Sequence, residues 1–193
     1  MGEHDAFAER GRALEEQYFQ RRERELIEKM RKAAAAEQER GALGEKTGLQ
    51  DSSLLQELQD MGFTPDTVML LPLVPVLEVA WAEGGITSSE RHLLLKLARS
   101  RGVDEDSAAD RQLQAWMSTR PEPLVFERAG RLIAALLTSG SEQARAGLTG
   151  EDLVAHCEKI AAISGGILGM GYVSREEREL LSRIASDLKT RQR

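Results

Sequence analysis

The fold is decided by residues 86–98, which read ITSSERHLLLKLA. Thr87, with Glu90 three positions later, forms the pattern of a capping box, in which the hydroxyl accepts from a helical N–H and the carboxylate accepts from the N–H of the cap residue. The apolar residues that follow share one helical face: Leu93, Leu94 and Leu97. This segment predicts a helix at about 88–101 with one buried face.

The same pattern occurs again 87 residues later, in residues 173–185, VSREERELLSRIA. Ser174 and Glu177 take the positions of the capping box. The core-face positions hold Leu180, Leu181 and Ile184. Because the two copies align without a gap and each follows a turn containing glycine, the sequence predicts an internal repeat whose second helix covers about 175–190.

The composition of the whole chain favours an all-α fold. The 193 residues are 41% apolar and only 4% aromatic, with leucine and alanine abundant. Residues 68–82 form an apolar run that is too short to span a bilayer and is interrupted by Pro72 and Pro75, so we expect a buried core element in two helical pieces. Further helices are expected after the caps Asp51 and Thr64-Pro65 and at about 105–118, 122–138 and 149–164.

Charge and cysteine content exclude several classes of protein. The net charge of −6 and the pI of about 5.3 argue against a nucleic-acid-binding surface, which needs concentrated lysine and arginine. The single cysteine, Cys157, excludes an internal disulfide framework and a cysteine-rich zinc site. The N-terminus has no basic start followed by an apolar run, so we expect a cytoplasmic protein without a signal peptide or membrane span.

The repeat resembles the TerB-like family, the all-helical domain of tellurite-resistance proteins, over about residues 68–190. The resemblance rests on the two copies of turn–(Ile/Val)–(Ser/Thr)–x–x–Glu–helix. It implies a TerB-like helical bundle and a stress-response or metal-responsive role, with a metal-binding surface between the repeats. The acidic residues at the matching positions are Glu83, Glu90 and Glu177.

Helix capping is a competing explanation for these acids. Glu90 and Glu177 are both placed to close capping boxes, and the second turn of the repeat has no acid. A hard cation such as Ca²⁺ takes six to eight oxygen ligands. We therefore expect no cofactor and prefer capping, with a divalent cation as the alternative.

No other residues form a recognisable catalytic constellation. His156 and Cys157 are adjacent in a predicted helix and point about 100° apart, so they cannot readily chelate one ion, and Cys157 is expected to be a small core residue or an inert thiol. The glycine-rich residues 164–171 lack the preceding strand and following lysine of a phosphate loop. We therefore expect the protein not to be an enzyme.

The N-terminal region predicts a long charged helix. Residues 6–32 read AFAERGRALEEQYFQRRERELIEKMRK, about half of them charged, and the helical pattern continues to about residue 40. Glycines at 41 and 44 are expected to end it. The sequence thus predicts two parts, residues 1–46 with the charged amphipathic helix and linker, and residues 47–193 with the TerB-like domain.

The apolar stripe of this helix changes face midway. With about 100° per residue, Phe7 and Tyr18 lie on one side, whereas Phe19, Leu26 and Met30 lie about 110° around the helix. A regular coiled coil would keep one seam over several heptads, so a simple dimeric coiled coil is disfavoured. A partner that wraps around the helix and a helix that is solvated or docked on its own domain both stay open.

Residues 6–32 also resemble the inhibitory segment of the mitochondrial ATPase inhibitor protein, most tellingly in the pattern Glu-Glu-x-Tyr-Phe. In that family the helix inserts into the catalytic head of the rotary ATP synthase and blocks ATP hydrolysis. The resemblance implies a protein partner, bound by Phe7, Glu15, Glu16, Tyr18, Phe19 and Arg22. This chain departs from the family at Gln20, where a basic residue is usual, and it lacks the histidine-containing dimerisation coil.

Two functional hypotheses follow. In the first, the chain is a non-enzymatic regulatory or binding protein whose N-terminal helix docks on a partner, with the ATP synthase head as the candidate. In the second, it is a TerB-like stress-response or metal-responsive scaffold whose N-terminal helix is structural.

Overall fold

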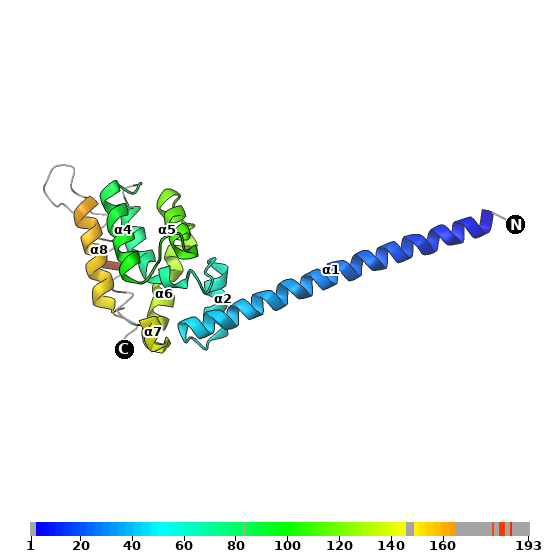
Figure 1. Cartoon of the computed structure of the whole chain (residues 1–193), viewed down its shortest axis with the longest axis horizontal. Coiled ribbons are helices and arrows are strands. Elements are labelled where there is room, and N and C mark those ends of the chain that lie inside the picture. Colours follow the sequence, from blue (N-terminus) through cyan, green and yellow to red (C-terminus); the bar gives the residue numbers. More distant parts are fainter. Residues whose placement is uncertain are drawn as a thin grey trace. The chain divides into compact units, whose positions relative to one another are not determined.

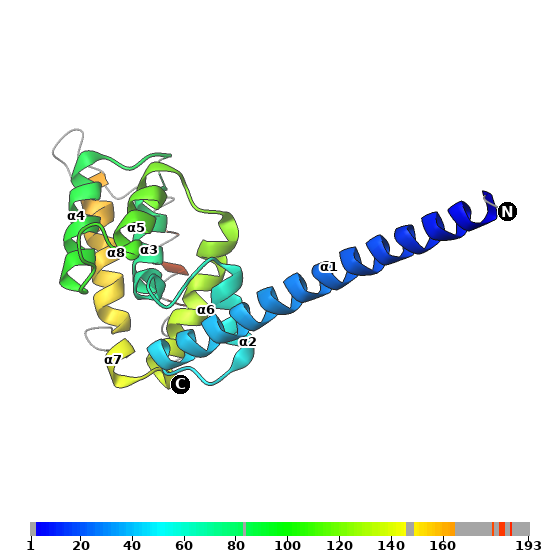
Figure 2. The ribbon, with the colours of Figure 1, turned by 45° about the vertical axis from the view of Figure 1, so that its right-hand side comes forward.

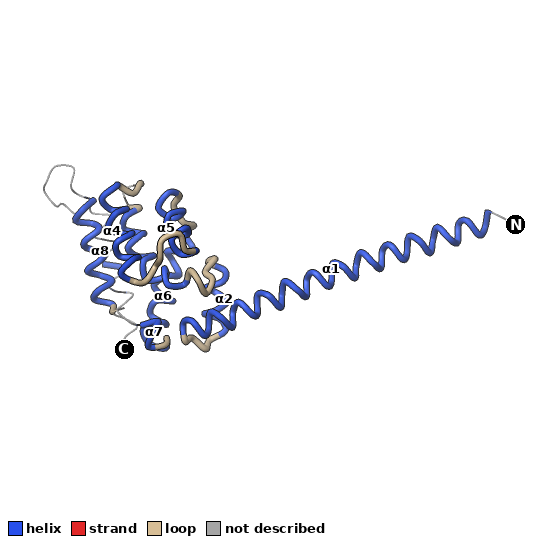
Figure 3. Tube along the Cα trace, viewed as in Figure 1, coloured by secondary structure: helices blue, strands red, loops and turns tan. Residues whose placement is uncertain are grey.

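A computed structural model describes residues 3–82, 84–145 and 149–164, together with positions 179, 182, 183 and 186; the side chains of residues 3–14 and of residue 164 lie outside the described part. The chain divides into two compact units, Met1–Gly41 and Ala42–Arg193. All secondary structure in the described ranges is helical, and no strand occurs there (Figures 1 and 3). The predicted all-α class, with a long N-terminal helix, is therefore confirmed.

The first helix, α1, runs from Glu3 to Thr47 and so continues past the two glycines that were expected to end it. Leu43 anchors its last turns, since this side chain is fully buried. Burial of a leucine side chain contributes roughly 1.5–3 kcal/mol, which is comparable to the combined cost of about 2 kcal/mol for two glycines inside a helix. The glycines at 41 and 44 are therefore tolerated.

Gly48 ends α1. Its φ of +76° lies in the left-handed region, where L side chains are strained. A Cβ atom at this position would also lie 2.3 Å from the backbone nitrogen of Ser141, whose N–H donates to the Thr47 carbonyl at 2.8 Å. The end of the helix is thus set by a close approach of two backbone segments that are distant in sequence.

The apolar run forms the centre of the Ala42–Arg193 unit. It folds as a 3₁₀ helix, η1 (Val68–Leu73), followed by α3 (Val74–Ala80), with Pro75 in the first turn of α3. The predicted buried element in two helical pieces is confirmed. The helix expected to begin at Thr64-Pro65 is wrong, because residues 64–67 form a turn in which the Thr64 carbonyl accepts from the N–H groups of Thr67 and Val68.

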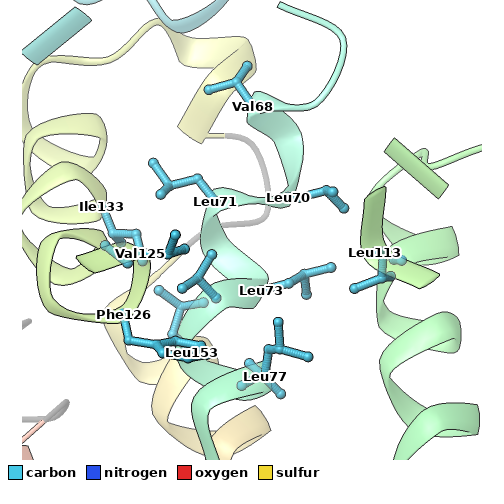
Figure 4. Packing of buried hydrophobic residues seen from close by; sticks show 14 of the residues in the cluster. Val68, Leu70, Leu71, Leu73, Leu77, Leu113, Val125, Phe126, Ile133 and Leu153 are labelled. Atoms are coloured by element: carbon cyan, nitrogen blue, oxygen red, sulfur yellow. The ribbon is translucent and has the colours of Figure 1, made fainter. Parts of the chain in front are cut away.

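Figure 4 shows side chains from several helices meeting those of η1 and α3. Leu113 comes from α5, Phe126 and Ile133 come from α6, and Leu153 comes from α8. All four are buried in the same cluster as Leu71 of η1. The core is therefore a ring of helices around one central apolar segment.

The remaining helices largely match their expected ranges. They are α2 (Ser52–Asp60), α4 (Ser88–Ser100), α5 (Ala108–Ser118), α6 (Pro123–Ser139), α7 (Glu142–Arg145) and α8 (Gly150–Ser164). Helices α4 and α8 lie side by side in both views (Figures 1 and 2). The short α7 was not predicted. The second copy of the repeat, with its expected helix at 175–190, lies outside the described residues except for isolated positions.

Two buried acids are held by arginines. Glu57, 6% exposed on α2, pairs with Arg131 of α6, while its other oxygen lies 3.5 Å from Nε of Arg128 without accepting a hydrogen bond. Asp110, 1% exposed on α5, accepts from Arg99 at 2.7 Å. Removing one partner of such a pair would leave an uncompensated charge inside the protein, which is strongly destabilising. The first pair connects α2 with α6, and the second connects α4 with α5.

The carboxylate of Asp110 is kept ionised by its hydrogen bonds. Burial by itself would raise the pKa of Asp110. The carboxylate also accepts hydrogen bonds from Arg99, from Gln114 at 2.8 Å and from the N–H of Asp106. These hydrogen bonds outweigh burial and hold the pKa of Asp110 below its usual range. Asp110 also lies in the first turn of α5, where a negative charge is favoured.

We predict that Gly48→Ala lowers the free energy of unfolding by about 2–5 kcal/mol, because it combines left-handed strain with a clash against Ser141. Urea denaturation followed by circular dichroism measures the change. Gly41→Ala is the matched control, since its Cβ would meet nothing within 4 Å and alanine favours the helix by up to about 1 kcal/mol. Equal effects of the two substitutions would contradict this account of the helix end.

We also predict that Asp110→Asn lowers stability at pH 7 by about 1–2 kcal/mol. Because the folded pKa is depressed, this stabilisation is present above the unfolded pKa of about 3.9 and is lost as pH falls through the folded value. The stability difference between wild type and Asp110→Asn should therefore shrink as the pH falls below about 3.9 and through the lower folded pKa, as urea denaturation series would show. Glu105→Gln, at an exposed position, serves as the control; a difference that is constant with pH would refute the role of the charge.

Candidate functional site

The exposed α1 segment, residues 15–35, has no buried side chain. Five large apolar residues lie on it, with exposed fractions of 57% for Tyr18, 67% for Phe19, 58% for Leu26, 42% for Ile27 and 64% for Met30. Among the described side chains, Leu124 on α6 is the other large apolar residue that is exposed. Exposed apolar surface of this extent on one helix is typical of an interaction site.

Tyr18 and Phe19 form a small ordered cluster on this segment. Their ring centroids lie 5.9 Å apart with an interplanar angle of 72°, an edge-to-face arrangement. The guanidinium carbon of Arg22 lies 5.9 Å from the centroid of the Tyr18 ring, within the range of a cation–π contact. The rings of Tyr18 and Phe19 lie where the apolar stripe of α1 changes face. Contacts between neighbouring residues of the helix hold these two rings together.

Two charged pairs follow the aromatic cluster along α1. Arg21 and Glu25 approach to 3.3 Å, and Glu28 and Lys32 approach to 2.7 Å, and the two residues of each pair are four positions apart. Each pair contributes about 0.2–0.5 kcal/mol to an exposed helix. These pairs help to keep the exposed α1 segment helical without the burial of any side chain.

Most residues predicted to bind a partner lie together on this segment. Glu15, Glu16, Tyr18, Phe19 and Arg22 are all exposed and fall within about two helical turns. Phe7 belongs to the same helix, but its side chain lies outside the described part.

The predicted metal-binding acids are only partly described. Glu90 is 1% exposed, and its Oε2 accepts from the N–H and the hydroxyl of Thr87 at 2.7 and 2.6 Å, completing the capping box. Glu83 and Glu177 lie outside the described residues. In the described part of the chain, no group of three or more His, Cys, Asp and Glu side chains could hold a metal ion.

The thiol of Cys157 is buried in surroundings that disfavour the thiolate. Burial, helped by the negative charges of Glu78 and Glu158, raises the pKa of Cys157 to about 12. A thiol with this pKa holds almost no thiolate at neutral pH, and the thiolate is the nucleophile and the metal ligand. The expectation of an inert core cysteine therefore has a physical basis.

A cleft in the Ala42–Arg193 unit was not predicted from the sequence. Its volume is about 560 Å³, and its lining comes from six elements. The lining residues are Glu45, Lys46, Thr47, Val68, Met69, Pro72, Ser100, Arg101, Leu136, Gln143, Ala144 and His156. Because these residues are scattered over more than a hundred positions, no local pattern could have revealed the cleft.

Comparisons of the chain with protein-family models, with curated proteins and with solved structures found no match. The two resemblances drawn from the sequence therefore stay predictions. Within the described residues, no helix combines the length and the hydropathy that crossing a bilayer requires.

The role of Glu90 can be tested directly. We predict that Glu90→Ala lowers the free energy of unfolding by about 1 kcal/mol, because the N–H of Thr87 and the start of α4 lose their cap. Glu90→Gln should lose less, since its amide oxygen can still accept from Thr87. Denaturation with and without Ca²⁺ supplies the control; a Ca²⁺-dependent gain in stability that vanishes in both variants would instead indicate a metal ligand.

Proposed function

We propose that this protein is a non-enzymatic regulator that binds a protein partner through the exposed α1 segment. The observation that carries the proposal is the exposure of the Tyr18–Phe19 pair on a formed helix. Helix-in-groove recognition uses such a helix, with apolar anchors that enter pockets of the partner.

The energetics favour this use of the helix. Exposed apolar surface gains roughly 25 cal/mol per Å² when it is buried, and an aromatic side chain buries about 150–250 Å². Tyr18 and Phe19 together could therefore supply several kcal/mol, and aromatic residues and arginine are the usual hot spots of interfaces. A helix that is already formed avoids much of the ordering cost that a disordered segment would incur on binding.

The arrangement of apolar residues also constrains the partner. Tyr18 lies on one side of α1, whereas Phe19, Leu26 and Met30 lie about 100° around it. A flat surface would cover only one of these stripes. A concave partner that contacts two faces of the helix would cover both, with the ion-paired residues at the rim.

The rotary ATP synthase head is the partner we propose. Support comes from the match of Glu15, Glu16, Tyr18 and Phe19 to the Glu-Glu-x-Tyr-Phe pattern of the ATPase inhibitor family and from the exposure of all four on a helix. A helix inserted at a catalytic interface would hold that interface in one conformation and slow ATP hydrolysis. The protein would then act as an inhibitor without catalysing any reaction itself.

The test is ATP hydrolysis by ATP synthase from the organism that encodes this chain, measured with increasing amounts of the full-length protein. We expect inhibition, and we expect Tyr18→Ala/Phe19→Ala to need at least about tenfold more protein, because it loses both anchors. Gln17→Ala is the matched control, because Gln17 is an exposed polar residue that directly precedes Tyr18 on α1.

Circular dichroism of each variant verifies that α1 stays helical, as expected for alanine substitutions. Absence of inhibition by the wild-type protein would refute the proposed partner. Inhibition that is equal for wild type and Tyr18→Ala/Phe19→Ala would refute the proposed binding surface and favour a scaffold whose α1 is structural.

A further inference from the structure

Helix α1 carries its charges in two unlike halves. Residues 3–18 hold five acidic and two basic side chains, whereas residues 19–34 hold three acidic and six basic side chains. With His4 neutral, the net charges of the two halves are therefore −3 and +3. A helix that complements this pattern must place a positive half beside residues 3–18 and a negative half beside residues 19–34. A second copy of α1, turned end to end, has that pattern.

The boundary between the halves lies between Tyr18 and Phe19, on one broad face of α1. With about 100° per residue, the two rings lie about 50° to either side of a line along the helix, and Glu15 and Arg22 lie within about 10° of that line. All four side chains are exposed. The face therefore presents two rings, with a negative charge one turn before them and a positive charge one turn after them.

A two-fold axis between Tyr18 and Phe19 makes this face complementary to itself. Two antiparallel copies then meet so that Glu15 of each copy lies opposite Arg22 of the other, and the four rings surround the axis. A parallel pair in register would instead place Glu15 against Glu15 and Arg22 against Arg22. Because like charges in contact oppose association, the charges select the antiparallel pair. A polar pair at the contact also fixes the register of two helices.

The exposed length of α1 fits this pairing. Residues 3–34 of the two copies would overlap, which is a contact roughly 48 Å long. Every side chain from residue 15 to residue 35 is exposed, so the described side chains in the overlap are uncovered. Within the described part of the chain, Glu15 makes no ion pair or hydrogen bond through its carboxylate. The guanidinium of Arg22 lies over the Tyr18 ring, and its N–H donors remain available at the edge of its plane.

We propose that the protein self-associates through α1 as an antiparallel pair of chains, with ion pairs between Glu15 of one copy and Arg22 of the other. The pair covers the Tyr18 and Phe19 rings of both copies. These rings are also the anchors of the interface proposed above, so the two copies must separate before α1 can bind another protein. That consequence rests on the proposed function, whereas the pairing itself does not.

Sedimentation equilibrium of the full-length protein tests the pairing, and we expect a monomer–dimer equilibrium for the wild type. Glu15→Arg and Arg22→Glu should each weaken self-association at least about tenfold, because each places like charges in contact at two symmetric positions. The double variant Glu15→Arg/Arg22→Glu should regain self-association, since it restores opposite charges in the antiparallel pair. An equimolar mixture of the two single variants should regain it for the same reason.

Arg24→Glu is the matched control for Arg22→Glu. It makes the same change of charge at an exposed position on the opposite side of α1. A charge away from the contact contributes little, so this variant should change the dissociation constant less than about fivefold. Circular dichroism verifies that α1 stays helical in each variant.

A spin label at Ala35→Cys measures the orientation of the two copies. Ala35 is exposed, and the one native cysteine, Cys157, is buried, so the label should attach only to the introduced thiol. Pulsed electron paramagnetic resonance should give a distance of about 50 Å between labels in the antiparallel pair. A parallel pair would give about 10 Å, the spacing of packed helices.

Three results would overturn the proposal. They are a wild-type protein that stays monomeric up to its solubility limit, single variants that associate like the wild type, and the short distance between labels. None of these measurements uses ATP synthase. A protein that pairs without inhibiting ATP hydrolysis would therefore refute the proposed partner alone, and a monomeric inhibitor would refute the pairing alone.

Discussion

The domain depends on the burial of one apolar segment, residues 68–80, which forms η1 and α3 at the centre of the Ala42–Arg193 unit. Leu71 and Leu77 are fully buried there, and each methylene removed from water contributes about 0.8 kcal/mol. Because every residue of this segment except Met69 and Glu78 is buried, α5, α6 and α8 surround it with their own apolar faces (Figure 4). The arrangement of these helices follows from covering this segment.

The two candidate sites differ in how they relate to this core. The cleft borders η1 at Val68 and Met69 and α6 at Leu136, so its apolar wall continues the core. The exposed α1 segment has the opposite origin: about half of its residues are charged, and none of its side chains is buried. One site is thus a gap in the packing, whereas the other is a helix supported by its own local interactions.

Local signals were read correctly where the chain depends on near neighbours. The capping box of Thr87 and Glu90 gave the start of α4, and Asp51 caps α2 as expected. Local signals were misread where residues distant in sequence determine the bounds of a helix. The end of α1 depends on the burial of Leu43 and on a hydrogen bond from Ser141 to Thr47, and the four-residue α7 has too short a pattern to detect.

The candidate sites show the same difference between features set by neighbouring residues and features set by residues distant in sequence. The sequence by itself determined the helical class, the central apolar run and the aromatic pair at Tyr18 and Phe19, because periodicity and capping act over only a few residues. Only the tertiary structure decided where α1 ends, which acids are buried against arginines, and that Arg101 and His156 line one cleft with Met69. Those features join segments that are far apart in sequence, and packing of the core alone brings them together.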